Sequence, residues 1–378
     1  MFSSELIGAR RGAWAIAGVF FVSAPAVGQT IDLEDVSLYA GSTLTLGSGA
    51  SVEGGAAVAV GDVFGTLDVD SIFGGGSLVS DGFDDTRGPV FFNGSITGVG
   101  GPGSVIDGPV TSVNGDIDIS GSTEVNGDVT AGGNISQTFT FGTFNGNVLA
   151  GGDVDLQGTV NGNVTHGGSL TLGTFANVTG TTASGGPVNP TPFVAPNLAP
   201  GSLLTAGSND INLATFQDIA LAPGTYGSLN YDEGNTVSLT AGTYVFADIV
   251  SGFSLNELSF DTTGGDIFIY IEAADVSLDL VQVVNGTALF AGVQPDPADA
   301  LEITLEVADS LTLASDFYGT VLAPEGNLTL DTFTELTGRA LAGGDVFLGD
   351  SAAILAVPEP ASFVALVGVF GLTARRRR

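Results

Sequence analysis

Thiol and imidazole side chains, the usual soft metal ligands and nucleophile or base pairs, are nearly absent from this 378-residue chain. The chain has no cysteine and a single histidine, His166. Because zinc sites and thiol catalysis depend on cysteine and histidine, the sequence excludes both. A Ser-His-Asp triad would have to use His166, and no Gly-x-Ser-x-Gly turn accompanies it. His166 lies in a Gly-Gly phrase whose two sibling phrases have Ala131 and Ala150, which favours a surface substitution.

Carboxylates are the abundant reactive groups. Asp81, Asp84 and Asp85 surround a glycine in one short loop, and oxygen ligands of this kind suit calcium. A solvated acidic loop is the alternative, because neither EF-hand spacing nor a Gly-Gly-x-Gly-x-Asp array is present. Weaker candidates are Asp232-Glu233, Asp296 and Asp299. Calcium is the one cofactor that the sequence suggests. Glycoside hydrolysis needs only two carboxylates, so this enzymatic class stays open, although no pair stands out.

Threonines two residues apart could present hydroxyls on one strand face. Such pairs occur as Thr43-x-Thr45, Thr138-x-Thr140 and Thr332-x-Thr334. Stacked on one another, they would form a hydroxyl lattice that suits ordered water or a glycan. So few pairs, scattered along the chain, argue against a complete ice-binding plane.

The charge of the chain restricts its partners. There is no lysine, and between the terminal segments only Arg87 and Arg339 oppose 39 acids, a net charge of about −37 (2 − 39). Nucleic acid is excluded, because phosphate binding needs a basic surface. Anionic polysaccharides would be repelled unless divalent cations intervened, and self-association should be eased by salt. The apolar content of 43% with scattered acids argues against disorder.

A repeated phrase predicts the fold. Copies run over 126–135, 145–154 and 161–170, with starts 19 and 16 residues apart (145 − 126; 161 − 145). Each holds two short alternating strands separated by glycine, and a turn rebuilt at this interval predicts stacked coils. The asparagines that open these phrases, with that of a partial copy, predict an asparagine ladder of Asn114, Asn126, Asn145 and Asn161.

The second half of the chain reuses the unit. Residues 338–346 nearly repeat 146–154, and period-two strands rich in β-branched residues cover 236–240, 266–271 and 276–280. The sequence therefore predicts an all-β fold, a parallel β-solenoid, because a β-sandwich would not explain near-identical phrases at coil spacing.

Five prolines interrupt this pattern. We expect a solenoid block over 29–184, a proline-rich seam over 185–202 and a second, stacked or consecutive, block over 203–356. The alternative is one continuous solenoid with the seam lying along its side.

Both ends have the composition of processing segments. Residues 1–28 combine Arg10 and Arg11, an apolar helix-length stretch and small residues, which predicts a signal peptide cleaved after Ala26 or Gly28. Residues 357–378 combine prolines, the apolar run 363–374 and four terminal arginines. Twelve helical residues span about 18 Å, so this short transmembrane helix would rely on snorkelling arginines. The arginines predict a cytoplasmic C-terminus and an exported body.

The tail resembles a PEP-CTERM sorting signal, the substrate of an exosortase-type membrane transpeptidase. The resemblance implies a recognised triplet, Pro358, Glu359 and Pro360. It also implies a membrane stop made of Arg375, Arg376, Arg377 and Arg378. A membrane-anchored precursor would then be delivered to the cell surface or beyond.

The body resembles two kinds of secreted solenoid. The Asn-Gly-Asp-Val phrases are similar to bactofilin-type coils, and the phrases over 221–226, 239–246, 317–324 and 336–342 are similar to ice-binding-like and adhesin-like solenoids. We expect an exported, non-enzymatic protein of the cell surface or extracellular matrix, with extracellular polysaccharide or a second copy as partner. An ice- or carbohydrate-binding adhesin is the alternative, and a polysaccharide-active enzyme is a weaker one.

Overall fold

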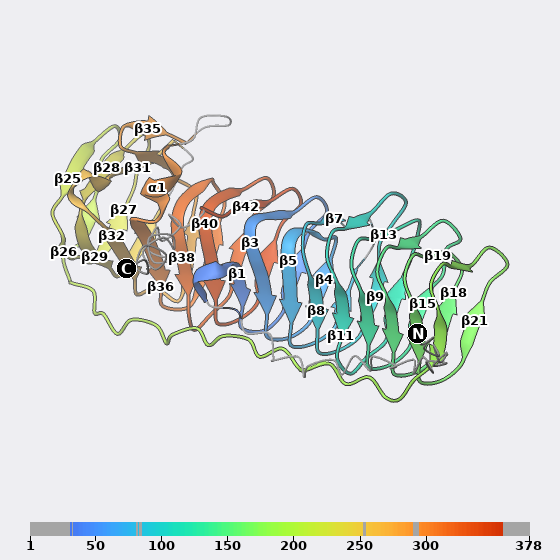
Figure 1. Ribbon diagram of the computed structural model, residues 1–378. Coiled ribbons are helices and arrows are strands. Elements are labelled where there is room, and N and C mark those ends of the chain that lie inside the picture. Colours follow the sequence, from blue (N-terminus) through green and yellow to red (C-terminus); the bar gives the residue numbers. More distant parts are fainter. Residues whose placement is uncertain are drawn as a thin grey trace, which may run out of the picture.

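The protein is a parallel β-solenoid of about 16 turns with almost no helix (Figure 1). The computed structural model describes residues 31, 33–80, 82, 85–251, 255–289 and 295–357. At about 4.8 Å per coil the solenoid is roughly 75 Å long. The prediction of an all-β parallel solenoid is thus confirmed. The signal segment 1–28 and the tail from Pro358 onward lie outside the described residues.

Each coil of the regular region contributes one strand to each of three faces. In one coil these are β14 (Val129–Ala131), β15 (Ile135–Gln137) and β16 (Thr143–Phe144). In three-residue strands such as β14, the outer two residues are buried and the middle one is half-exposed. Val129 stacks between the same inward position of β11 (Val110–Ser112) and β17 (Val148–Ala150), so aliphatic columns fill the bore.

We name the first face, a single sheet, the twelve-strand face. Its strands in spatial order are β33 (Asp275–Leu278), β37 (Ser310–Leu313), β39 (Leu328–Leu330), β41 (Val346–Leu348), β2 (Leu44–Leu46), β4 (Val63–Gly65), β6 (Leu78–Val79), β9 (Ile96–Val99), β12 (Ile117–Ile119), β15, β18 (Val154–Leu156) and β21 (Leu170–Leu172). A small sheet near β33 contains β24 (Ile211–Asn212), β27 (Ser228–Asn230) and β30 (Asp248–Val250).

The second face is named the strap face, because an irregular segment covers it. Its strands in spatial order are β26 (Gly224–Thr225), β29 (Gly242–Phe246), β32 (Ile267–Ile271), β36 (Ile303–Val307), β38 (Phe317–Ala323), β40 (Glu335–Ala342), β1 (Val36–Ala40), β3 (Ser51–Ala59), β5 (Asp68–Gly74), β8 (Val90–Phe92), β11, β14, β17, β20 (Val164–His166) and β23 (Thr182–Ser184). Short helical turns are η1 (Leu33–Asp35), η2 (Thr262–Gly264) and α1 (Pro297–Ala300).

The third face carries many outward carboxylates and is named the acidic face. It contains the first residues of β40, β3 and β5, with β42 (Ala353–Leu355), β7 (Asp85–Thr86), β10 (Val105–Ile106), β13 (Glu124–Val125), β16, β19 (Thr159–Val160) and β22 (Asn177–Val178). Toward the other end it consists of β25 (Asp218–Leu221), β28 (Thr236–Thr240), β31 (Glu257–Asp261), β34 (Val281–Val284) and β35 (Thr287–Ala288).

The coil order in space differs from the order in the chain. The last described coil pairs with the first on all three faces: β40 with β1, β41 with β2, and β42 with β3. In Figure 1 the red and blue coils lie side by side in the middle of the stack. The chain therefore forms one continuous solenoid, which is the alternative expected from the sequence, and not two separate blocks.

The proline-rich segment is a strap and not a seam between blocks. Residues 185–210 leave the coil of β23, run along the strap face and reach the opposite end of the solenoid (Figure 1). On the way Phe193 packs on Phe73 and Phe91, with ring centroids 5.5 and 6.4 Å away. About 26 extended residues span up to roughly 85 Å, so the strap is just long enough for this return.

Polar side chains link the strap to the coils that it crosses. The backbone N–H of Phe193 donates to Asn93 at 2.8 Å, and the Asn93 amide donates back to the Phe193 carbonyl at 2.9 Å. The Tyr39 hydroxyl donates to the Pro196 carbonyl at 2.8 Å. Near the far end, the Ser202 hydroxyl donates to Glu306 at 2.8 Å. These bonds fix the strap to coils of both halves of the chain.

An asparagine ladder is present at one corner. The Asn145 amide donates to the Asn126 side chain at 2.7 Å, and the Asn161 amide donates to Asn145 at 2.8 Å. Asn126 in turn donates to Asp107 at 2.6 Å. The predicted ladder is confirmed for these three asparagines. Asn114 was wrongly included, because Val110 is the residue aligned with Val129, which places Asp107 and not Asn114 in the row.

Candidate functional site

One column of outward side chains crosses the middle of the twelve-strand face. In register, neighbouring strands place the following uncharged side chains on top of one another, and we call them the outer row: Ser277, Thr312, Thr329, Phe347, Thr45, Phe64, Val79 and Thr97. Successive members are one coil rise apart, about 4.8 Å. The row crosses the junction of the two halves of the chain, since Thr45 is paired with Phe347 on one side and Phe64 on the other.

The centre of the outer row is apolar and accessible. Phe64, Val79 and Phe347 have exposed fractions of 40%, 45% and 45%. Thr45, between the two phenylalanines, is half-exposed. Exposed apolar side chains that are grouped on a protein surface commonly mark an interaction site. Ring faces beside a hydroxyl can hold a ligand that has both apolar and hydroxylated surfaces.

Beyond Thr97 the same column becomes polar. Its next members are Asp118, Ser136, Asp155 and Thr171. The Ser136 hydroxyl donates to Asp118 at 2.7 Å, so part of this polarity is satisfied internally. The uncharged and apolar part of the column is therefore confined to the coils between β33 and β9.

A second set of side chains, the corner row, borders the twelve-strand face. Each member's side-chain oxygen accepts the backbone N–H of the following coil: Ser310, Asn327, Asp345, Asp62, Ser77, Ser95, Asp116, Asn134 and Asp153. The bond from Thr43 N–H to Asp345, 2.9 Å long, lies at the junction of the two halves. These oxygens bind the backbone and hold the coils in register.

Hydrogen bonding changes the acidity of this row. The Thr43 N–H, with the Ser42 hydroxyl, lowers the pKa of Asp345 below its usual range. The Ser169 N–H and hydroxyl lower the pKa of Asp153 in the same way. Because these bonds stabilise the charged form, both carboxylates are poor candidates for general acids.

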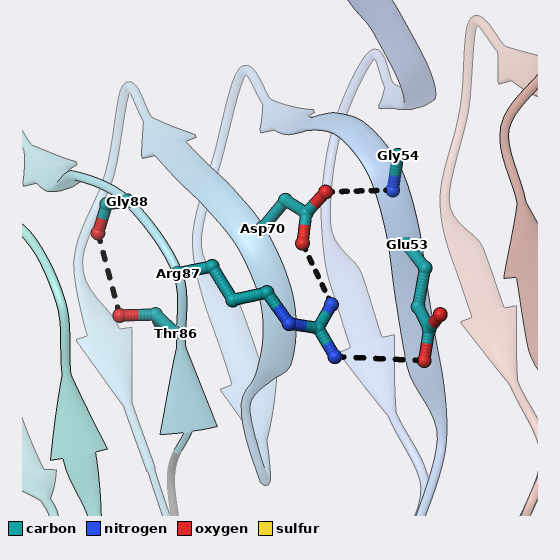
Figure 2. Close-up of polar contacts among 6 residues, drawn as sticks. All are labelled: Glu53, Gly54, Asp70, Thr86, Arg87 and Gly88. Atoms are coloured by element: carbon teal, nitrogen blue, oxygen red, sulfur yellow. Dashed lines mark hydrogen bonds and ion pairs between the residues drawn. The ribbon is translucent and has the colours of Figure 1, made fainter. Parts of the chain in front are cut away.

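The acidic face carries an ion cluster that joins three coils (Figure 2). Arg87 lies 2.7 Å from Asp70 and 3.7 Å from Glu53, and Asp70 also accepts the Gly54 N–H at 2.7 Å. Burial raises the pKa of nearby Asp68, although Arg87 opposes the shift. The side chain of Arg87 is 57% exposed, so this cluster is a set of surface ion pairs that links neighbouring coils.

The predicted calcium ligands are only partly described. Asp85 lies on β7, where it accepts the Val105 N–H at 2.9 Å, while Asp81 and Asp84 lie outside the described residues. Within the described ranges, no three acidic or histidine side chains are grouped so that they could hold a metal ion. The calcium site remains a prediction.

The weaker acidic candidates have local partners. Asp232 accepts a hydrogen bond from the Thr215 hydroxyl at 2.7 Å, and Asp299 accepts one from the Asn285 amide at 2.9 Å. Asp296 precedes the short helix α1, and its carbonyl accepts the Asp299 N–H at 2.9 Å. The first two bonds join segments 17 and 14 residues apart in the chain, and the third lies within the turn that begins α1.

His166 lies at the end of β20 on the strap face. Its Nδ1 is 2.8 Å from the Gly168 carbonyl oxygen, within its own turn. This placement agrees with a surface substitution in a repeated turn.

The threonine pairs do not stack as a lattice. Only Thr45 belongs to the outer row; Thr138 and Thr140 lie in a turn, and Thr334 is buried. The sequence signal for part of the row is the triplet Leu-Thr-Leu at 44–46, 311–313 and 328–330, in which the single threonine points outward. The same triplet at 170–172 lies in the polar continuation of the column.

The sorting residues cannot be placed on this framework. Pro358, Glu359, Pro360 and Arg375 to Arg378 all lie outside the described residues. In the part of the chain that the structure describes, no helix is long and apolar enough to cross a membrane.

Comparison with known proteins gives only distant neighbours. No protein-family model matches the chain. No curated protein matches it significantly in sequence. Among solved structures, an ice-binding protein from an Antarctic Flavobacteriaceae bacterium is similar, with 12% identity, a TM-score of 0.25, and coverage of 85% of this chain and 96% of that one.

A second neighbour is a possible adhesin C-terminal domain from Caldicellulosiruptor kronotskyensis. It has 9% identity and a TM-score of 0.28, with coverage of 88% of this chain and 96% of that one. Both TM-scores are below 0.5.

Proposed function

We propose that this protein is an exported, non-enzymatic surface protein that binds a neutral polysaccharide along its outer row. The observation that carries the proposal is the in-register stack of Phe347, Thr45 and Phe64 on an open sheet face. A chain of sugars lying along the solenoid axis would meet a ring, a hydroxyl and a second ring on successive coils.

The chemistry of the row matches a sugar polymer. The C–H faces of pyranose rings pack on exposed aromatic rings, and threonine hydroxyls both donate and accept hydrogen bonds. The surrounding charge selects the class of glycan. With a body charge of about −37, an anionic polysaccharide would be repelled, whereas a neutral one is unaffected.

The proposal is tested by a glycan array followed by calorimetry on the neutral glycans that bind. The double variant Phe64→Ser, Phe347→Ser should weaken binding by about tenfold or more, since aromatic anchors dominate such surfaces. Phe216→Ser is the matched control, because Phe216 is 75% exposed and lies away from the row. Equal affinity in the double variant and in the control would refute the proposal.

Ice binding is a second candidate that one observation favours. Thr312, Thr329 and Thr45 share the outer row at multiples of one coil rise. Phe347 interrupts these hydroxyls, which is why a glycan is preferred. Ice binding would be favoured if the wild-type protein showed thermal hysteresis but bound no glycan, and if Thr329→Tyr abolished the hysteresis. Glycan turnover would instead support the enzymatic alternative.

Export rests on the terminal segments and not on the solenoid. The signal peptide and the Pro358-Glu359-Pro360 triplet support delivery to the surface by an exosortase-type enzyme. Intact-mass measurement of surface-released protein tests this part separately. A mature chain that still ends in Arg378 would make the tail a plain anchor, while leaving the glycan proposal intact.

A further inference from the structure

One end of the solenoid lacks charge. From Leu156 to Asn209 the chain has no Asp, Glu, Lys or Arg. At the chain average of 13% charged residues, these 54 residues (209 − 156 + 1) would carry about seven charges. The segment contains the whole terminal coil, which is formed by β21, β22 and β23. This coil is therefore a neutral end on a strongly acidic molecule.

In the part of the chain that the structure describes, no further coil covers this terminal coil. Each of its strands has one partner among the described residues: β21 pairs with β18, β22 with β19, and β23 with β20. Within the described ranges, the outer edge of each strand thus has no strand beside it. Solenoids usually cover or charge such edges, because open edges invite pairing with another chain.

Apolar side chains are exposed at this end as well. Leu172 is 46% exposed, although the equivalent Leu156 one coil earlier is fully buried in the bore. Phe175, in the turn between β21 and β22 of this coil, is 72% exposed. The terminal coil therefore leaves part of the hydrophobic bore of the solenoid exposed.

The opposite end differs in its charge. Its first coil carries Asp210 and Asp218, and the next coil adds Asp232 and Glu233. Acids on edge strands discourage pairing by like-charge repulsion. Contact between a neutral end and an acidic end would continue into filaments, whereas contact between two neutral ends closes after two copies.

We propose that two copies of this chain stack through their neutral ends into a closed dimer. The twofold axis makes the β21, β22 and β23 edges of one copy meet those of the other in antiparallel pairing. The interface covers Leu172 and completes the core across the twofold axis. Salt strengthens the dimer, because it screens the repulsion between two acidic bodies. This inference is independent of the glycan-binding proposal.

Sedimentation velocity of the purified protein over a range of concentrations provides the first test. We expect a monomer–dimer equilibrium that shifts toward dimer as salt is raised. Thr182→Asp places a charge on the exposed edge strand β23 and should raise the dimer dissociation constant by about tenfold or more. Ala220→Asp, on the exposed edge strand β25 of the opposite end, is the matched control and should leave the dimer unchanged.

Each contrary outcome overturns the proposal. A monomer at all concentrations and salts would show that another segment of the chain covers the end or that the end stays open. Filaments would show that unlike ends join. Matching circular dichroism spectra and melting temperatures for both variants confirm that a loss of dimer is not a loss of fold.

Spin-label distances test the orientation. The chain has no cysteine, so a single introduced cysteine can be labelled specifically. Labels at Asn177→Cys on β22 should lie within roughly 30 Å of each other in the dimer, the width of a coil. Labels at Ala220→Cys should be about 150 Å apart, twice the length of a solenoid, and give no dipolar signal. A short distance at Ala220→Cys would refute the end-to-end arrangement.

Discussion

At the residue scale, the corner row shows how single oxygens hold the coils together. Asp345 accepts the Thr43 N–H at the junction of the two halves, and Asn134 performs the same task for Asp153 N–H at 2.7 Å. Asparagine and aspartate are thus interchangeable as acceptors in this row. They differ in one respect, since only aspartate loses an acceptor when it is protonated.

The first prediction concerns Asp345 and pH. Its folded-state pKa is lowered, so the ionised form contributes stability above the unfolded-state pKa, and this contribution is lost as pH falls through the lower folded-state pKa. Asp345→Asn keeps the acceptor and removes the titration. The urea midpoint of the wild type, measured relative to that of Asp345→Asn at the same pH, should therefore decrease once the pH drops below about 4. If the difference between the two urea midpoints were the same at pH 6 and at pH 2.5, the stabilising role of ionised Asp345 would be contradicted.

At the element scale, the strap joins coils that are distant along the chain. Phe193 is 3% exposed and fills a cluster with Phe73 and Phe91 on the outside of the sheet. Asn93 fixes the backbone of the same residue through two hydrogen bonds. Phe193 is therefore the main anchor of the strap over the first half of the solenoid.

The second prediction tests this anchor. Phe193→Ala should destabilise the protein by about 3 kcal/mol, the usual loss for a buried phenylalanine. Hydrogen exchange should rise along the strap and much less in the bore. Val194→Ala is the control, because Val194 is 68% exposed and adjacent. Unchanged exchange in the strap would show that other contacts hold it.

At the scale of the whole molecule, stability depends on the junction of the two halves. Gly41 and Gly343 approach closely there, and a Cβ added to Gly41 would lie 2.0 Å from the Gly343 carbonyl oxygen. Neither half can shift away without breaking the pairing of β1 with β40. The junction is therefore the place where one cooperative unit could separate into two.

The third prediction follows from this close approach. Gly41→Ala should destabilise the protein by about 2 kcal/mol or more through overpacking, and should split a single unfolding transition into two. Gly186→Ala is the control, because nothing lies within 4 Å of its added Cβ. A single transition at the wild-type midpoint would mean that the junction adapts without loss.

The sequence by itself determined the structure of each coil and which of its residues point inward. The phrases at 126–135, 145–154 and 161–170 carry their own glycine turns and inward aliphatics, and such local signals specify a solenoid wherever the coil lies in the stack. The ladder of Asn126, Asn145 and Asn161 followed for the same reason, since consecutive coils are consecutive in the chain.

Only the tertiary structure decided which coils are neighbours across the junction and where the proline-rich segment runs. Coils resemble one another, so nothing local states that 340–342 pairs with 38–40 or that 185–210 returns along one face. The outer row depends on the same information. Thr45 acquires Phe347 as a neighbour through a pairing that joins residues 302 positions apart (347 − 45), a distance over which no sequence period reaches.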